Sequence, residues 1–522
     1  MAVASGVDLC YTVIKSGLIP CIEKKKERID MSFKLTIIGA GSLTFARTLF
    51  TDIMHVPALR GIEVAFTDIS RQNLDMVTQL CQRDLEANGI PTKIFATTDR
   101  REALRGARYI VNCVRIGGLE AFETDIDIPL KYGVDQCVGD TLCIGGIMYG
   151  QRGIAAVLDF CKDIREVAEP NALLLNYSNP MAMLTWACIK YGGVRTLGLC
   201  HGEIHGEMQI AEVLGLKDRS ELDVTCAGLN HQTWYISVKH RGEEMIGRLL
   251  EAFEAHEVYR NTEKVRIDVL RRFGYYSTES NGHLSEYVAW YRKRPGEIER
   301  WIDLSSWING ETGGYLRETR ENRNWFETEF PRLMAEPPMD YENGERSSEH
   351  GSYIIEALET GRVYRGHFNV MNRGAIANLP DECVVEVPCY VDGSGISVPR
   401  VGELPLGCAA VCSQSAWVQR LAVEAAVSGD AELLKQAALM DPLTGAVCNP
   451  PEIWQMVDEM LIAQEAWLPQ YGEAIAAAKA RFAAGNLIPT NEGYRGAVRQ
   501  RVKTAQEVAA ERREREARHR RE

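Results

Sequence analysis

The stretch Lys34-Leu-Thr-Ile-Ile-Gly-Ala-Gly-Ser-Leu-Thr-Phe45 decides the expected fold of this 522-residue chain. Its apolar run, Leu35 to Ile38, predicts a buried strand that ends in a glycine turn and leads into a helix. In a dinucleotide-binding unit Gly39 permits the sharp turn, Gly41 lets the backbone approach a pyrophosphate, and the helix N-terminus binds that anion. Thr44 replaces the third glycine of the usual fingerprint. This stretch alone is therefore equally compatible with a turn that binds nothing.

Two later strands favour a nucleotide site. The stretch 62–68 predicts a buried strand ending in Asp68, whose carboxylate would bond a ribose 2′-hydroxyl and repel the 2′-phosphate of NADP. The strand predicted over 108–114 carries Asn112 near its end, where a cofactor ring would lie. We therefore predict an NAD site made by Gly39, Gly41, Ser42, Asp68 and Asn112.

The order of the predicted elements indicates the fold class. Strand and helix signals alternate from residue 33 to about residue 198, as expected for a parallel sheet covered by helices on both faces. After that point helices are mixed with short alternating strands. The expected class is α/β, with a Rossmann-like doubly wound parallel sheet over residues 32–199 and a mixed α+β domain over residues 200–490. Residues 1–31 are expected to be an N-terminal extension, residues 491–522 a charged C-terminal tail, and residues 310–343 an exposed connection.

The bulk composition limits the partners of the protein. A net charge of −13 disfavours nucleic acid and anionic membranes. No apolar run reaches the roughly 18 residues that a membrane-spanning helix needs. The 15 cysteines are odd in number and include no C-x-x-C pair, which is typical of reduced thiols in the cytoplasm. We therefore expect a cytoplasmic globular protein with no nucleic-acid or membrane partner.

Two motifs place metal-binding side chains after predicted strands. Cys200 and His201 follow a short strand over residues 194–199, and His231 closes the stretch Gly228-Leu-Asn-His231. Thiolate and imidazole both bind first-row transition metals, and softness alone favours zinc or iron for a Cys–His pair without a carboxylate. The alternative is that Cys200 is a buried apolar residue and His231 a loop histidine without a ligand.

A polar stretch further along the chain could supply a general base. Residues 273–287, with the sequence Phe273-Gly-Tyr-Tyr-Ser-Thr-Glu-Ser-Asn-Gly-His-Leu-Ser-Glu-Tyr287, contain two acids, a histidine and three tyrosines. Interleaved glycines and serines predict a loop, where such side chains cost little to place and can reach a substrate. A polar surface turn is the equally acceptable alternative.

The chain resembles glycoside hydrolase family 4 over about residues 33–470. The motifs that carry the resemblance are Gly39-Ala-Gly-Ser42, Ile128-Pro-Leu-Lys-Tyr-Gly133, Gly139-Asp-Thr141, Gly145-Gly-Ile147, Asn176-Tyr-Ser-Asn-Pro180, Gly198-Leu-Cys-His-Gly202, Gly228-Leu-Asn-His231 and Asn378-Leu-Pro380. The resemblance implies an enzyme that uses NAD and a divalent metal, typically Mn²⁺, and that forms a homodimer or homotetramer. It implies that NAD⁺ oxidises C3 of the sugar, and that a base then removes the C2 proton while the metal stabilises the enediolate. The aglycone leaves by elimination, and water and the hydride are added back.

The resemblance also assigns roles to individual residues. Cys200 and His231 match the metal ligands of the family, and His201 matches the position that assists the leaving group. Asn179 matches a substrate-binding asparagine, Asp140 matches a contact to the substrate or to a metal-bound water, and Arg115 is a further candidate for substrate binding. The base stays open between Glu279 and its rivals Tyr276, His283 and Tyr287.

Departures from the family pattern narrow the expected substrate. Family members that act on phosphorylated sugars carry Cys-Asp or Cys-Asn and an arginine near position 122, whereas this chain has Cys200-His201 and Phe122. Residues 274–293 look most like the α-galactosidase branch, but Gly202 is typical of α-glucosidase-like and α-glucuronidase-like members. We expect an unphosphorylated α-glycoside, an α-galactoside first, with an α-glucoside, an α-uronide or a rarer α-hexoside as alternatives. Other classes are a simple NAD-dependent hydroxy-acid dehydrogenase and a non-catalytic NAD-binding sensor.

Overall fold

The computed structural model describes residues 10–14, 17–21, 32–43, 45–304, 310–323 and 325–519. Within the predicted N-terminal extension, β1 (Cys10–Ile14) and β2 (Gly17–Cys21) pair as an antiparallel hairpin. The rest of residues 1–31 lies outside the described residues, and so does Thr44 of the glycine turn. The predicted fold is therefore assessed from residue 32 onward.

Six parallel strands form the first half of the central sheet. They are β3 (Lys34–Ile38), β4 (Glu63–Thr67), β5 (Lys93–Thr97), β6 (Ala107–Asn112), β7 (Leu173–Asn176) and β8 (Arg195–Gly198). Their order across the sheet is β5-β4-β3-β6-β7-β8, with all neighbours parallel. Because strand order reverses beside β3, a crevice forms outside the carboxyl ends of β3 and β6, where such sheets bind nucleotides.

The sheet continues into the second half of the chain through an antiparallel pairing. Gly198 of β8 pairs with Asn369 of β13 (Tyr364–Met371). Beyond β13 come β14 (Val384–Asp392), β9 (Leu222–Leu229), β10 (Gln232–His240) and β11 (Glu243–Glu244), while the short β12 (Tyr276–Ser277) pairs with β10 and β15 (Gly395–Ser397) with β14. The α/β fold class with a mixed α+β second part is confirmed, and strands of both parts share one sheet.

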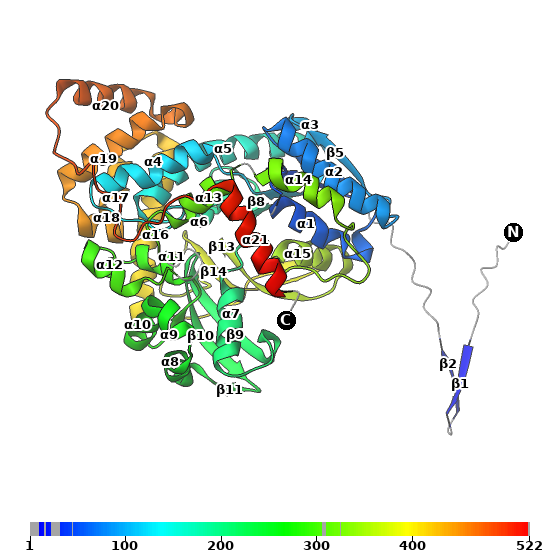
Figure 1. Ribbon diagram of the computed structural model, residues 1–522. Helices are drawn as coiled ribbons and strands as arrows, with labels where there is room; N and C mark the ends of the chain where they lie inside the picture. Colours follow the sequence, from blue (N-terminus) through cyan, green and yellow to red (C-terminus); the bar gives the residue numbers. More distant parts are fainter. Residues whose placement is uncertain are drawn as a thin grey trace.

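Helices cover the sheet, and Figure 1 shows α1, α2 and α3 near β5 at one end of the molecule and α17 to α20 at the other. The first group is α1 (Phe45–Met54), α2 (Arg71–Ala87), α3 (Arg100–Leu104), α4 (Gly118–Lys131), α5 (Cys143–Val167) and α6 (Met181–Lys190). The middle group is α7 (Gly202–Val213), α8 (Ile246–Ala255), α9 (Tyr259–Thr262), α10 (Lys264–Phe273), α11 (Asn281–Glu286), α12 (Pro295–Trp301), α13 (Gly314–Glu321), α14 (Trp325–Ala335) and α15 (His350–Thr360). The last group is α16 (Leu406–Ser428), α17 (Ala431–Met440), α18 (Pro442–Val447), α19 (Pro450–Ala463), α20 (Gly472–Ala484) and α21 (Ala505–His519).

The expectation of an exposed connection over residues 310–343 is wrong for its first part. Residues 310–314 are buried, and α13 and α14 follow them. The abundance of Glu, Arg and Gly suggested exposure, but Arg317 and Glu311 form an ion pair (2.7 Å) that satisfies both charges inside the structure. A charged composition therefore did not exclude burial here.

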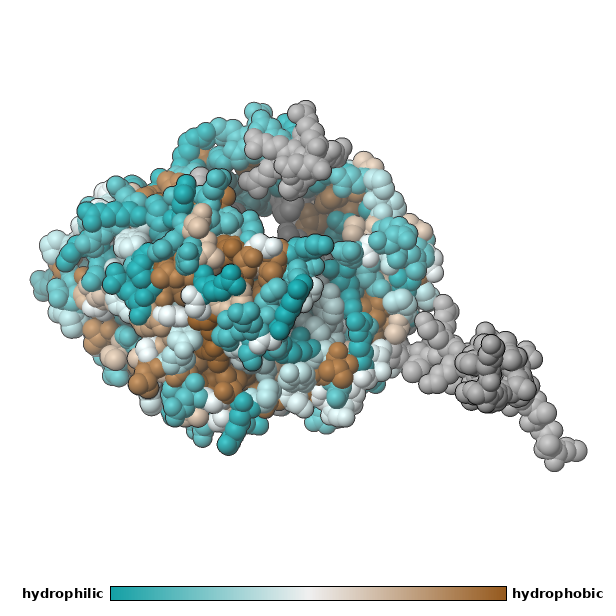
Figure 2. All heavy atoms as spheres, turned by 90° about the horizontal axis from the view of Figure 1, so that it is seen from below, coloured by the Kyte–Doolittle hydropathy of each residue, from teal (hydrophilic) through white to brown (hydrophobic). Residues whose placement is uncertain are grey.

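Figure 2 shows hydrophilic side chains spread over the face seen from below, with hydrophobic ones in scattered clusters. Among the described residues, no helix combines the length and apolar character that crossing a membrane requires.

Candidate active site

A cavity of about 580 Å³ lies beyond the carboxyl ends of the parallel strands. Its wall is built by both halves of the chain, because loops after β3, β6, β7 and β8 meet the turn between β9 and β10 and the residues around α11. The predicted site residues that line it are Ser42, Arg115, Asp140, Asn179, Cys200, His201, His231, Glu279 and His283. The structure thus brings together side chains that are up to 241 positions apart, from Ser42 to His283.

Cys200 and His231 face each other in this wall. The Cys200 Sγ atom lies 3.5 Å from the His231 Nε2 atom. Two atoms that ligate one metal ion at about 2.0–2.3 Å are separated by roughly this distance. His231 occupies the turn between β9 and β10 with a φ of 64°, a left-handed conformation that is uncommon for histidine. The left-handed backbone conformation directs the imidazole toward Cys200, which follows β8.

Hydrogen bonds fix the tautomer of His231. The Thr141 hydroxyl donates to Asp140 Oδ1 (2.8 Å), so its oxygen accepts the proton of His231 Nδ1 at 2.8 Å. The lone pair of Nε2 is therefore left facing Cys200, as in metal sites where an outer partner orients a histidine ligand. Burial lowers the pKa of His231, which keeps the ring neutral. Burial also raises the pKa of the Cys200 thiol, so a thiolate at this position requires a compensating cation.

Glu279 brings a carboxylate to the same cluster. Its Oε1 atom lies 3.9 Å from His231 Nε2, and its Oε2 atom lies 2.8 Å from His283 Nδ1. Burial alone would raise the pKa of Glu279, but the charge and hydrogen bond of His283 outweigh it and lower that pKa. Burial opposes protonation of His283, but the charge of Glu279 outweighs it and raises the pKa of His283 to about 9. Glu279 is thus held ionised beside a protonated His283.

The absence of a side chain at Gly202 makes room for Glu279. A Cβ atom built at Gly202 would lie 2.6 Å from Glu279 Oε1 and 3.7 Å from Cys200 Sγ. The backbone of Gly202 is the first turn of α7 and requires no glycine conformation, so the requirement is purely one of space.

Gly202→Ala should therefore displace the Glu279 carboxylate without unfolding the protein. The atom that must move is the end of a flexible side chain, so we expect a melting temperature close to that of the wild type and a fall in kcat of about 10- to 100-fold. Gly247→Ala in α8 is the control, because a Cβ atom there meets nothing within 4 Å. Equal kcat values for the two variants would contradict the steric role of Gly202.

His201 lies at the start of α7 on the cavity wall. Its Nδ1 atom lies 2.7 Å from Glu349 Oε1. Burial opposes the charged ring, but the hydrogen bond and charge of Glu349 outweigh it and raise the pKa of His201. A protonated imidazole on a cavity wall can donate a proton to a departing oxygen.

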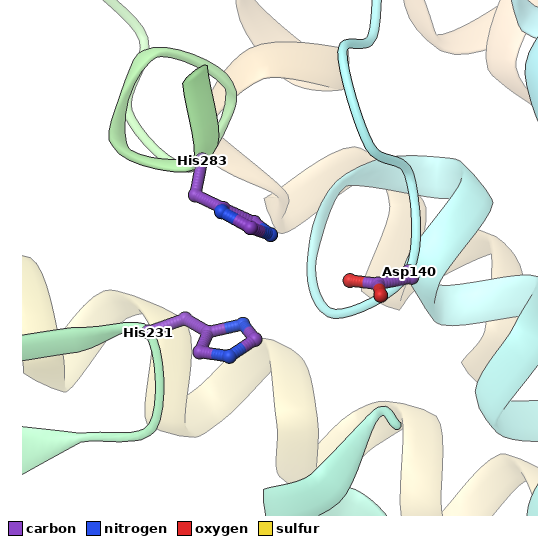
Figure 3. A group of neighbouring side chains, drawn as sticks. All are labelled: Asp140, His231 and His283. Atoms are coloured by element: carbon purple, nitrogen blue, oxygen red, sulfur yellow. The ribbon is translucent and has the colours of Figure 1, made fainter. Parts of the chain in front are cut away.

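Three predicted substrate residues meet at Asp140. Asn179 donates from Nδ2 to Asp140 Oδ2 (2.9 Å), and Arg115 Nη2 lies 3.9 Å from the same oxygen. Figure 3 shows the side chains of Asp140, His231 and His283 pointing toward one shared space from three separate segments. Arg115 stacks on the Phe122 ring at 4.4 Å, and its Nη1 atom is buried without a hydrogen-bond partner. That unpaired donor and the Asp140 carboxylate suit a ligand rich in hydroxyl groups.

The glycine turn after β3 lies directly against Asp68. Gly39 has a φ of 92°, and a Cβ atom at Gly41 would lie 2.8 Å from the Asp68 carboxylate. Asp68 accepts from the Gly41 N–H at 2.9 Å, which places the carboxylate beside the turn. Asn112, by contrast, is fully buried and donates to Asn176 Oδ1 (2.9 Å), so its amide points to the neighbouring strand instead of the cavity.

Two of the four candidate bases lie behind the cavity wall. The Tyr276 hydroxyl donates to Gln209 (3.1 Å), and the ring stacks on the Arg266 guanidinium at 4.0 Å. Tyr287 is fully buried and lies parallel to the His231 ring, with centroids 6.1 Å apart. Glu279 and His283 are the candidates that reach the cavity.

Two functional partners were missed in the sequence. Thr141 was part of the motif Gly139-Asp-Thr141 but received no role, and Glu349 lies 148 positions after His201 with no motif around it. The neighbourhood of Asp140 could have suggested Thr141, whereas only the folded chain shows Glu349.

Comparisons with known proteins show the family of this chain. A model of the family 4 glycosyl hydrolases matches residues 34–216, and a model of the C-terminal domain of that family matches residues 226–444. The chain is 60% identical over 482 residues to an α-galactosidase of Rhizobium meliloti (strain 1021), covering 92% of this chain and 98% of the relative. It is 35% identical over 443 residues to an α-galactosidase of Bacillus subtilis (strain 168), covering 84% and 99%. A 6-phospho-α-glucosidase from gut microorganisms, solved in complex with NAD and glucose-6-phosphate, superimposes with a TM-score of 0.68 at 26% identity and covers 84% of this chain and 99% of its own.

Proposed function

Because the chain belongs to family 4 of the glycosyl hydrolases, we propose that it is an α-galactosidase that requires NAD and a divalent metal, with Mn²⁺ the first choice. The main support for the proposal is that Cys200, His231 and Glu279 lie close together in one cavity, which His201 also lines. The two α-galactosidase relatives support a galactoside. An unphosphorylated sugar is supported by Phe122, which is fully buried under Arg115 and leaves no arginine at that position for a phosphate.

The donor groups of the chain fit both cofactors. Gly39, Gly41, Ser42 and Asp68 would hold NAD, because Gly39 makes the tight turn, Asp68 lies beside Gly41 and Ser42 lines the cavity. Cys200 and His231 would hold the metal, with the Nε2 lone pair of His231 already directed at the Cys200 sulfur. When bound, NAD supplies a reversible hydride acceptor and the metal supplies a Lewis acid for sugar oxygens.

The remaining residues act on protons and on the orientation of the sugar. Glu279, ionised and held by His283, accepts a proton from a carbon of the sugar ring. His201, protonated through Glu349, donates a proton to the oxygen of the leaving group. Asp140, Asn179 and Arg115 bind sugar hydroxyl groups and thereby fix the ring relative to Glu279.

Omitting either cofactor tests the proposal directly. Hydrolysis of 4-nitrophenyl α-D-galactoside should fall to background when NAD⁺, Mn²⁺ or thiol reductant is removed by dialysis, and should return on re-addition. The α-glucoside and the α-glucuronide, assayed in parallel, should be cleaved more slowly. A galactoside labelled with deuterium at C2 should show a primary isotope effect.

Two results would overturn the proposal. Undiminished cleavage without NAD⁺ would indicate direct displacement by two carboxylates. Accumulation of NADH with a hydroxy acid, without cleavage of any glycoside, would indicate a dehydrogenase.

A cytoplasmic location and a homodimer or homotetramer complete the proposal. The location is supported by the 13 cysteines of the described part of the chain that stand as free thiols, since thiols persist in a reducing compartment. Light scattering of the purified protein would give the oligomeric state.

A further inference from the structure

The segment between α20 and α21 runs along the loops that form one side of the cavity. We call residues 491–503 the C-terminal strap. It begins where the Asn491 N–H donates to the Lys131 carbonyl (2.9 Å) and ends where the Lys503 N–H donates to Glu321 (2.8 Å). Figure 1 shows that the chain then continues into α21, which lies on the same side of the molecule as α13. The strap lies after the last residue matched by either family model, residue 444.

We propose that the C-terminal strap positions the substrate side of the cavity, by holding the loops 135–141 and 310–315 in place. The charged C-terminal tail expected from the sequence therefore begins with a segment that serves the active site. The inference rests on the proposed function for its kinetic readout, and on hydrogen bonds of the described residues for its geometry.

The first contact of the strap is with residues 310–315. The Thr312 N–H donates to the Val498 carbonyl (3.0 Å), and the Val498 N–H donates to the Thr312 hydroxyl (3.3 Å). The Gln500 N–H donates to Glu311 at 3.1 Å. One backbone bond and two bonds to side chains therefore hold the strap against residues 310–315.

The second contact is with Asp135, a carboxylate that is 1% exposed. Its Oδ2 atom accepts from the Ala497 N–H (2.9 Å), its Oδ1 atom accepts from the Thr312 hydroxyl (2.8 Å), and it forms an ion pair with the fully buried Arg292. A buried carboxylate needs all of its partners, because each lost hydrogen bond leaves part of its desolvation uncompensated. Asp135 thus joins the strap, residues 310–315 and the start of the 135–141 loop.

The two loops that the strap contacts also form part of the cavity wall. The Gly313 N–H donates to the Gln136 carbonyl (2.8 Å), which ties the two loops together. The backbone N–H groups of Val138 and Gly139 donate to Glu286 (both 3.0 Å), and Asp140 follows at once. At the other loop, Tyr315 lines the cavity with its ring 5.3 Å from the Arg115 guanidinium. The strap thus contacts the loops that carry Asp140 and Tyr315, and it acts on these two side chains through the loops.

The strap does not reach the metal pair by any of these bonds. Cys200 and His231 are carried by β8 and by the β9–β10 turn, and the 135–141 loop reaches this pair only through Thr141, which orients His231. A disturbed strap should therefore impair binding of the sugar more than binding of the metal. That difference separates a positioning role from a general loss of structure.

Gly496 is the position where the strap can be disturbed by one atom. It has a φ of 97°, and a Cβ atom there would lie 2.1 Å from Thr312 Cγ2. Gly493, three residues earlier, has room for a Cβ atom, whose nearest neighbour is Asn491 Oδ1 at 3.7 Å. Gly485 has a similar positive φ, 76°, with nothing within 4 Å of its Cβ position. The two control glycines separate the effect of the clash from the effect of backbone strain.

The test compares Gly496→Ala with Gly493→Ala and Gly485→Ala. For Gly496→Ala we expect KM for the α-galactoside to rise about tenfold with kcat within about threefold, and Mn²⁺ affinity, measured by electron paramagnetic resonance, to change by less than about threefold. Amide hydrogen exchange should accelerate in residues 135–141 and 310–315. Neither control should change KM or exchange in these loops.

A second pair of variants covers the case in which Gly496→Ala does not fold. Thr312→Val removes the hydroxyl that joins Asp135 to Val498, whereas Thr312→Ser keeps it. The valine variant should show the raised KM and faster exchange, and the serine variant should restore both. An unchanged KM in Gly496→Ala or in Thr312→Val would overturn the inference. If the wild type itself hydrolyses no α-galactoside, the proposed function fails, and the exchange measurement still decides the role of the strap.

Discussion

Replacing Cys200 by serine is expected to abolish tight Mn²⁺ binding and to lower kcat/KM for an α-galactoside by about 10³-fold. A Lewis acid contributes several kcal/mol to a reaction of this kind, and about 1.4 kcal/mol corresponds to a tenfold change in rate. Serine has nearly the same size as cysteine, but its hydroxyl stays protonated and does not replace a thiolate ligand. Titration of Mn²⁺ followed by electron paramagnetic resonance measures the binding, and steady-state hydrolysis measures the rate.

Cys389→Ser provides the matched control for this experiment. Cys389 lies in β14, is fully buried, and donates from its sulfur to the Val387 carbonyl at 3.5 Å, a bond that serine can also make. We expect Cys389→Ser to keep both Mn²⁺ affinity and activity close to those of the wild type. If Cys200→Ser retains the Mn²⁺ affinity of the wild type, the metal is held elsewhere in the cavity.

The structure changes the argument about the identity of the metal. From the residues alone, cysteine and histidine without a carboxylate favoured zinc or iron. The folded chain places the Glu279 carboxylate within the same cluster, so that the sulfur, nitrogen and oxygen atoms of Cys200, His231 and Glu279 all lie within 4.8 Å of one another. Oxygen donors suit manganese, and sugar hydroxyl groups would add more of them. If Glu279 is a ligand, its carboxylate favours Mn²⁺, and if it is the base, the sugar hydroxyl groups supply the oxygen donors.

Local sequence patterns were enough to predict the parallel half of the sheet. Strands such as β3 and β6 are mostly apolar, and short apolar stretches bounded by glycine or polar residues are typical of strands buried on both faces. The join between the two halves was not predictable in the same way. It depends on the pairing of Gly198 with Asn369, two residues 171 positions apart, and no periodicity within either strand indicates that partner.

Site residues that follow a strand were predictable from the sequence. Site residues in loops and in very short helices or strands were not. Cys200 and Asn179 follow β8 and β7 directly, so the strand assignments already placed them at one edge of the sheet. Whether a tyrosine of residues 273–287 faces the cavity or the core depends on β12 and α11, which are too short to predict from periodicity. Tyr276 consequently lies against Arg266 in the core, while Glu279, three residues later, reaches the cavity.

No sequence pattern next to Glu279 identifies it as a base. Its role follows from the side chains that surround it in the folded chain. The protonated His283 keeps the carboxylate ionised inside a buried site, where burial alone would favour the neutral acid. An ionised carboxylate without a full set of hydrogen-bond donors is able to accept a proton from a substrate. The space that Gly202 leaves open lets this carboxylate stand beside the metal pair.

Replacing Glu279 by glutamine is accordingly expected to lower kcat by about 10²- to 10⁴-fold, the range over which a positioned general base contributes. Glutamine has the same shape and still fits beside Gly202, but its amide does not accept a proton. The primary isotope effect on C2 should increase, because removal of that proton then limits the rate alone. Glu279→Asp should keep part of the activity, since it retains the charge on a shorter side chain. Parallel measurement of Mn²⁺ affinity decides between two roles. If the affinity stays within about threefold of that of the wild type, Glu279 is the base, whereas a loss of Mn²⁺ binding as large as that of Cys200→Ser would make it a third metal ligand.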